Sequence, residues 1–155
     1  MHTDTTAVMN NDNHNADFLT EAAGGGMIEV QLGQHAKTHA SSQAVKDFRA
    51  MMVRDHSNAN TQIKSLAAKK SVALPSALQE KHQKHINDLA AKNGIAFDKD
   101  YISMMVDDHK EDIRFFEKCA KNDKEDADIK AFAAKTLPTL YKHLNDAKAV
   151  KDKMK

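Results

Sequence analysis

The sequence predicts an all-α protein, a four-helix bundle made of two antiparallel hairpins with a short extra helix in the crossover between them. The composition favours helices over sheets, because the 155 residues include only 5 Gly and 2 Pro and only 5% are aromatic. Apolar residues recur every three or four positions from residue 16 onward, which is the helical period. Polar breaks divide this pattern into four long segments and one short one, as a bundle with one long connection requires.

The first two helices are expected over about residues 16–40 and from there to about residue 70. The segment "ASSQAVKDF" separates them, and Ser41 or Ser42 can cap the second helix by accepting hydrogen bonds from its free N–H groups. The turn is tight, so the two helices should lie antiparallel and adjacent.

The rest of the chain predicts a short helix and a second hairpin. Pro75 suits the first turn of a short helix over about 76–92, which should end at Asn93 and Gly94, where glycine can take the left-handed conformation. Helices over about 98–121 and 128–152 follow, joined by the polar turn "KNDKEDAD". Pro138 lies inside the last helix and should kink it or open a backbone carbonyl.

We divide the chain into a disordered polar leader, residues 1–15, and a single bundle domain, residues 16–153. The leader is rich in Asn, Asp and Thr and has few residues that could join a core. No stretch reaches the roughly 18 apolar residues that a membrane helix needs. No signal-peptide pattern is present either, which does not establish a cytoplasmic location, because such a signal can be missing from the chain.

Charge and cysteine content exclude two further classes of protein. The net charge is +1, from 23 basic and 22 acidic residues that alternate along the chain, so we expect no nucleic-acid partner. The basic tail "KAVKDKMK" is expected to be a solvated helix end. Cys119 is the one cysteine, which rules out an internal disulfide, and its apolar neighbours predict an inert core thiol.

Histidines occupy positions where the apolar stripe of a helix should continue. The segments "MMVRDH" and "MMVDDH" each place a histidine, His56 and His109, four residues after a methionine of the core face. His143 in the last helix and Glu29 in the first continue their apolar stripes in the same way. Each long helix therefore carries one residue on its core face that can bind a metal.

These four residues should also lie at similar heights in the bundle. Glu29 and His56 are about twelve and fourteen residues from the first turn, a mismatch of only about 3 Å at the helical rise. His109 and His143 are about fourteen and fifteen residues from the second turn. Three imidazoles and a carboxylate suit one zinc, copper, iron or manganese ion, with zinc as the first expectation. The alternative is a buried Glu–His hydrogen-bond network without metal.

Asp55 and Asp108 precede two of the histidines and point about 100° away from them on the helix. We expect these carboxylates either to hydrogen-bond to ligating rings and orient them, or to lie at the surface, rather than to bind the ion. The pairs His35/His39 and His82/His85 have helical spacing but lie on polar faces, where solvation is the favoured interpretation. Glu21 and Glu117 lie two turns from the site and are expected on the solvent side, and the paired methionines are expected to fill the core.

The glycine run in "AAGGGMIEVQLG" is costly inside a helix, at roughly 2–3 kcal/mol relative to alanine. A phosphate-binding loop is a poor explanation, since no strand precedes the run and no Lys-Ser/Thr follows it. Close approach of a neighbouring helix, or room beside Glu29 that opens a path to the site, explains it better.

Four stretches together resemble a bacterial family of unknown function: "EAAGGGMIEVQLGQHA", the two "MMV-x-DH" segments, "FDKDYISMMVDDH" and "IKAFAAKTLPTLYKHL". The resemblance covers about residues 16–150. It implies a ferritin-like four-helix bundle and an exported protein, periplasmic, secreted or associated with the outer membrane, but no activity. The chain contains no Glu-x-x-His motif, which ferritin-type di-iron sites use, so a mononuclear site rich in histidine is preferred.

Three functions fit these observations. The first is an exported metal-binding bundle that serves metal sequestration or stress protection. The second is a small metal-dependent oxidoreductase acting on oxygen or peroxide, which needs a redox metal and an open coordination position. The third is a structural or interaction module in which a buried Glu-His network sets the helix register.

Overall fold

The computed structural model describes the backbone of residues 2–154 and the side chains of residues 16–154. Within that range all regular structure is helical, which confirms the all-α prediction. The helices are α1 (His2–His39), α2 (Gln43–Lys69), α3 (Glu80–Ala90), α4 (Gly94–Lys121) and α5 (Ala127–Lys153).

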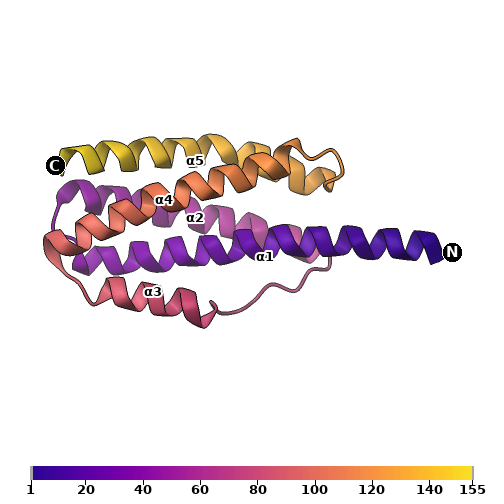
Figure 1. The fold of residues 1–155 in the computed structure, drawn as a ribbon, viewed down its shortest axis with the longest axis horizontal. Helices are drawn as coiled ribbons and strands as arrows, with labels where there is room; N and C mark the ends of the chain where they lie inside the picture. Colours follow the sequence, from indigo (N-terminus) through magenta and orange to yellow (C-terminus); the bar gives the residue numbers. More distant parts are fainter. Residues whose placement is uncertain (1, 155) are drawn as a thin grey trace.

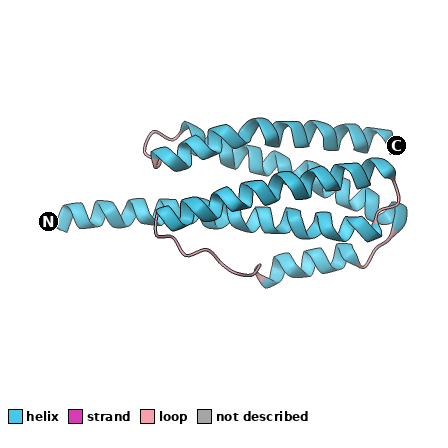
Figure 2. Ribbon diagram, turned by 180° about the vertical axis from the view of Figure 1, so that it is seen from behind, coloured by secondary structure: helices cyan, strands magenta, loops and turns pink. Residues whose placement is uncertain are grey.

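The four long helices form a bundle of two hairpins (Figure 1). Helix α1 packs mainly against α2 and α4 mainly against α5, and the two hairpins meet through α1 with α4 and α2 with α5. The link between α2 and α3 runs back along the bundle, so α2 and α4 point the same way (Figures 1 and 2). Helix α3 lies outside the four, against α1 and α4.

Helix α1 begins at His2 rather than at residue 16. Its N-terminal part extends past the end of the other helices (Figure 1). The backbone of residues 2–15, predicted as a disordered leader, therefore continues α1, since the segment contains neither Gly nor Pro to stop a helix that has already formed. The division between leader and domain at residue 15 stays a prediction.

Two predicted helix starts are corrected by the structure. Helix α3 begins at Glu80, not in the turn after Pro75, and α4 begins at Gly94, which has the expected positive φ of 67°. Ser42 occupies the cap position of α2 without a side-chain cap bond. The buried carboxylate of Asp98 takes that role, accepting from the backbone N–H of Ser41 at 3.1 Å and of Ser42 at 2.8 Å. A cap supplied from another helix cannot be found by looking at the residues next to α2.

The core consists of two apolar clusters, one toward each end of the bundle. The first includes Met52 and Met105, and the second includes Ile63 and Ile113. Along α2 and α4 the histidines fall between the members of these two clusters. Burying a large apolar side chain contributes about 1.5–3 kcal/mol, so the two clusters hold the helices around a polar layer that cannot contribute in this way.

Two glycines allow α1 and α2 to approach closely. A Cβ on Gly33 would lie 2.6 Å from a methyl carbon of Val53, and one on Gly26 would lie 1.9 Å from Oδ1 of Asn60. Close approach therefore explains one member of the glycine run, while a Cβ on Gly24 would meet nothing within 4 Å.

No helix among the described residues combines the length and apolar character needed to cross a membrane.

Candidate metal centre

The four residues predicted from helical spacing are all buried. The exposed fractions are 2% for Glu29, 7% for His56, 0% for His109 and 1% for His143. Their burial confirms the spacing argument, because a histidine or glutamate on a solvated face would keep most of its surface.

The three histidines come together from three different helices. One ligand atom from each of His56, His109 and His143 lies within 4.8 Å of the other two. The ring centroids are 5.7 Å apart for His56 and His109, 5.1 Å for His56 and His143, and 5.3 Å for His109 and His143. We call these residues the histidine cluster. Within the described residues they form the one group of three or more potential metal ligands at such spacing.

The backbone of α4 determines the tautomer of His109. Its Nδ1 lies 2.8 Å from the carbonyl oxygen of Met105, one turn earlier in the helix. A carbonyl can only accept, so Nδ1 carries the proton and Nε2 keeps a lone pair. That Nε2 is buried and has no hydrogen-bond partner.

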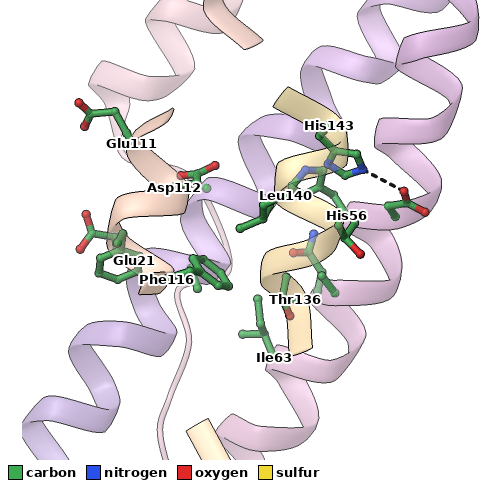
Figure 3. A pocket seen from close by; sticks show the side chains of 17 residues that line it. Glu21, His56, Ile63, Glu111, Asp112, Phe116, Thr136, Leu140 and His143 are labelled. Carbon is green, nitrogen blue, oxygen red and sulfur yellow. Dashed lines mark hydrogen bonds and ion pairs between the residues drawn. The ribbon is translucent and has the colours of Figure 1, made fainter. Parts of the chain in front are cut away.

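A carboxylate from α2 determines the tautomer of His143. Nε2 of His143 lies 2.9 Å from Oδ2 of Asp55, and an ionised carboxylate can only accept, so Nε2 is the donor. Nδ1 of His143 is then the nitrogen with the lone pair, and it is buried without a partner. Asp55 therefore orients a ring from another helix, not that of its sequence neighbour His56, as the predicted 100° offset allows. The dashed line in Figure 3 marks this bond.

Each ring thus has a buried nitrogen without a partner: Nε2 of His56, Nε2 of His109 and Nδ1 of His143. Leaving a buried polar atom unpaired costs about 1–3 kcal/mol, so three in one place require an explanation. Metal ligation by neutral imidazole supplies one, and a second group that holds each ligating ring in position is its usual companion.

The protonation states agree with this chemistry. Burial lowers the pKa of His56 to about 3, helped by the two neighbouring histidines. Burial likewise lowers the pKa of His109 to about 4. The pKa of His143 is lowered by burial, although the hydrogen bond to Asp55 works in the opposite direction. At neutral pH the rings are therefore neutral, the form that binds a metal.

Glu29 and Asp108 lie outside the histidine cluster. Glu29 is not part of the group whose ligand atoms are within 4.8 Å of one another. The histidine rings bond to Met105 and Asp55, not to Asp108. Burial raises the pKa of Glu29 well above its usual value, and the nearby carboxylates of Asp108 and Asp112 raise it further. The sequence places Glu29 on the core face of α1 and Asp108 about 100° away from the core face of α4, but it does not show that the two acids lie near each other.

A cavity of about 270 Å³ adjoins the histidine cluster. His56 and His143 lie on one side of it, with Ile63 and Leu140, while Glu21, Glu111 and Asp112 lie across from them (Figure 3). Asn60 also lines this cavity, and its Oδ1 is buried and has no hydrogen-bond partner. The helical spacing did not single out Asn60. This residue lies four residues after His56 at the edge of the apolar stripe, where a polar side chain is not unusual.

The remaining candidates have other roles. Nδ1 of His39 lies 2.8 Å from Oδ1 of Asn93, and its ring stacks on Phe97 at 5.6 Å, which ties α1 to the turn before α4. Glu117 is half-buried and accepts a hydrogen bond from Tyr141 at 2.7 Å. The thiol of Cys119 is buried, and burial raises its pKa to about 12, so it is not a reactive nucleophile at neutral pH.

Comparison with known proteins gives a family and no relative of known activity. Neither a search of curated proteins nor a search of solved structures found a match. A family model described as "Domain of unknown function (DUF4142)" matches residues 1–150, and the chain therefore belongs to this family.

Proposed function

We propose that the protein is a metal-binding helical bundle in which His56, His109 and His143 hold one transition-metal ion. The observation that carries the proposal is the set of three buried ring nitrogens without partners, one from each of three helices. Two of the three lone pairs are assigned by hydrogen bonds on the opposite side of the ring. Zinc is the preferred ion, since neutral imidazoles are ligands of borderline metals, with copper, iron and manganese as the other candidates.

An ion bound by three histidines keeps at least one coordination position for another ligand. The cavity reaches two of the three rings, so a small molecule could approach from that side. Glu29, which the spacing predicted as a fourth ligand, stands apart from the histidines, and we assign it to a different cation below.

The bundle arrangement and the location belong to the same proposal. Two antiparallel hairpins with a long crossover that leaves α2 and α4 parallel support a ferritin-like arrangement. The resemblance noted from the sequence motifs supports an exported protein that acts in the periplasm, outside the cell or at the outer membrane. Metal sequestration or protection against metal stress fits such a location.

Elemental analysis of the purified protein tests the proposal directly. After loading with zinc and removal of free ion, wild type should hold about one equivalent. The variants His56→Ala, His109→Ala and His143→Ala should each lose most of it, with helix content checked by circular dichroism. A His82→Ala/His85→Ala double variant provides the control, because these histidines lie outside the cluster and should not affect occupancy. Full occupancy in the three single variants, or no uptake of any of the four metals by wild type, would exclude the site.

The cavity favours a second candidate function, a small metal-dependent oxidoreductase acting on oxygen or peroxide. This function needs a redox metal and room for a small substrate beside it, and about 270 Å³ next to His56 and His143 provides the room. Iron- or manganese-loaded protein should then consume peroxide faster than the zinc-loaded form, and Ile63→Trp should slow it by filling the cavity. Equal rates of peroxide consumption for all metals, at the level of the metal-free protein, would exclude the oxidoreductase and leave metal binding as the one proposed function.

A further inference from the structure

The metal site proposed for the three histidines does not include the buried carboxylate of Glu29. Its side chain is 2% exposed, and Oε2 makes no hydrogen bond. An ionised carboxylate in such a place is costly unless a positive charge or several donors compensate it. The charged side chains that act on Glu29 are the carboxylates of Asp108 and Asp112, which add to the cost.

Asp108 and Asp112 reach this place together because they are four residues apart and share one face of α4. That face is turned toward α1, since a Cβ on Gly25 of α1 would lie 4.0 Å from Oδ1 of Asp112. We call Glu29, Asp108 and Asp112 the carboxylate cluster. Burial raises the pKa of Asp112 to about 7, and the nearby carboxylate of Asp108 raises it further.

The carboxylate cluster is accessible from solvent. A groove of about 1160 Å³ between α1, α3 and α4 is lined by all three acids. His82 and His85 of α3 line it as well, and His85 acts on Asp108 by lowering its pKa. Arg114, also in the groove, is paired with Glu111 at 3.0 Å. Among the described residues no ion pair joins a basic side chain to any of the three acids, so no basic group of the protein neutralises them when they ionise.

We propose that Glu29, Asp108 and Asp112 bind a divalent cation through oxygen ligands in the groove between α1, α3 and α4, at a site separate from the histidine cluster. Carboxylate oxygens are the ligands that calcium and magnesium prefer, whereas imidazole suits neither. The acids are more widely spaced than the histidines, since they form no group within 4.8 Å. This spacing suits a cation that keeps part of its water shell, as magnesium does, or one that accepts irregular geometry, as calcium does.

Calcium and magnesium themselves are the probes, since they leave the histidine cluster free. Titration calorimetry on metal-free wild type should show one site for at least one of the two ions. Glu29→Gln and Asp112→Asn, each close in shape to the original side chain, should weaken binding at least tenfold. Glu111→Gln is the matched control, because Glu111 lines the same groove but is exposed and paired with Arg114, and it should bind like wild type.

The results separate this proposal from the one for the histidines. His56→Ala should keep the calcium or magnesium site, and Glu29→Gln should keep zinc. The absence of any calcium or magnesium binding by wild type, or unchanged affinity in both Glu29→Gln and Asp112→Asn, would overturn the carboxylate site. Loss of zinc from the histidine variants does not enter this test, so either site can fail without the other.

Discussion

The histidine cluster is fully buried, and in the carboxylate cluster Glu29 is buried while Asp108 and Asp112 are half-buried, yet loss of solvent affects the two clusters in opposite ways. Desolvation penalises the charged form of each side chain, so it lowers the pKa values of the histidines and raises those of the acids. The histidines are thereby neutral and ready to bind metal at pH 7. The acids resist ionisation, and they gain most from a cation that replaces their missing partners.

The two clusters also differ in the support that surrounds them. Two histidine rings are held by Met105 and Asp55, so the ligand geometry exists before any ion arrives. Glu29 has no hydrogen bond on Oε2. We therefore expect the histidine cluster to be the tighter and more selective of the two. The following predictions test this difference, from the largest effect to the smallest.

Removing the ion from the histidine cluster should have the largest effect on stability. An ion at 100 times its Kd stabilises the folded state by about 2.7 kcal/mol, which corresponds to about 5–10 °C in Tm for a domain of this size. A strong chelator should lower the Tm by that amount, and adding back one equivalent of zinc should restore it. An unchanged melting curve would support the structural module, in which the histidines only set the helix register.

Asp55→Asn should weaken zinc binding about 10–100-fold, because the ring of His143 loses the carboxylate that sets its tautomer. Competition with a coloured zinc chelator measures the change. Asp108→Asn is the control: Asp108 precedes a ligand in the same way as Asp55 does but lies in the other cluster, and zinc affinity should stay within about twofold of wild type. Equal losses in the two variants would mean that general charge, not ring orientation, controls affinity.

The two clusters should give the metal-free protein opposite pH dependences. Asp112 has a folded-state pKa of about 7, above its usual 3.8, so its destabilising effect is full above pH 7 and disappears as the pH falls toward 3.8. Asp112→Asn should raise the free energy of unfolding by about 1–2 kcal/mol at pH 8, and by much less at pH 5. Urea unfolding of both proteins in a chelator measures this.

His109 should act in the other direction. Its folded-state pKa of about 4 lies below the usual 6.5, so the unfolded chain takes up the proton first and stability is lost as the pH falls from 6.5 to 4. His109→Gln should flatten this loss in the metal-free protein. If Asp112→Asn and His109→Gln change the pH profile in the same direction, the two clusters do not have the opposite electrostatics described above.

Substitutions in the glycine run should have the smallest effects on stability. The run lies between the cavity beside the histidine cluster and the groove beside the carboxylate cluster. Gly24 lines the groove, Gly26 lines the cavity and Gly25 lines both. The Cβ added by Gly24→Ala would have no atom within 4 Å, so this variant should raise the free energy of unfolding by up to about 1 kcal/mol through helix propensity. Gly26→Ala would place its Cβ 1.9 Å from Oδ1 of Asn60, so the gain should be offset as Asn60 is displaced. Thermal melts of the two variants give the comparison, and a larger gain for Gly26→Ala would contradict it.

Much of the fold could be predicted because helices leave a periodic trace in the sequence. The spacing of apolar residues located α2 and α5 to within a few residues, and the core positions of Glu29 and the three histidines followed from the same period. Helix ends were predicted less well. Ser41 and Ser42 looked like the cap of α2, but the capping carboxylate belongs to Asp98, 56 residues away in sequence from Ser42. Local patterns do not contain such long-range contacts.

The sequence by itself determined that each long helix carries a metal-capable residue on its core face, since side-chain direction in a helix depends only on spacing. Tertiary structure decided which of these residues meet. The rotation and offset of the packed helices brought His56, His109 and His143 together and left Glu29 with Asp108 and Asp112. They also placed Asp55 against His143 rather than His56. The reason is physical: the helical period specifies a face, whereas contacts across a bundle depend on how the helices are rotated and shifted against one another, which packing alone sets.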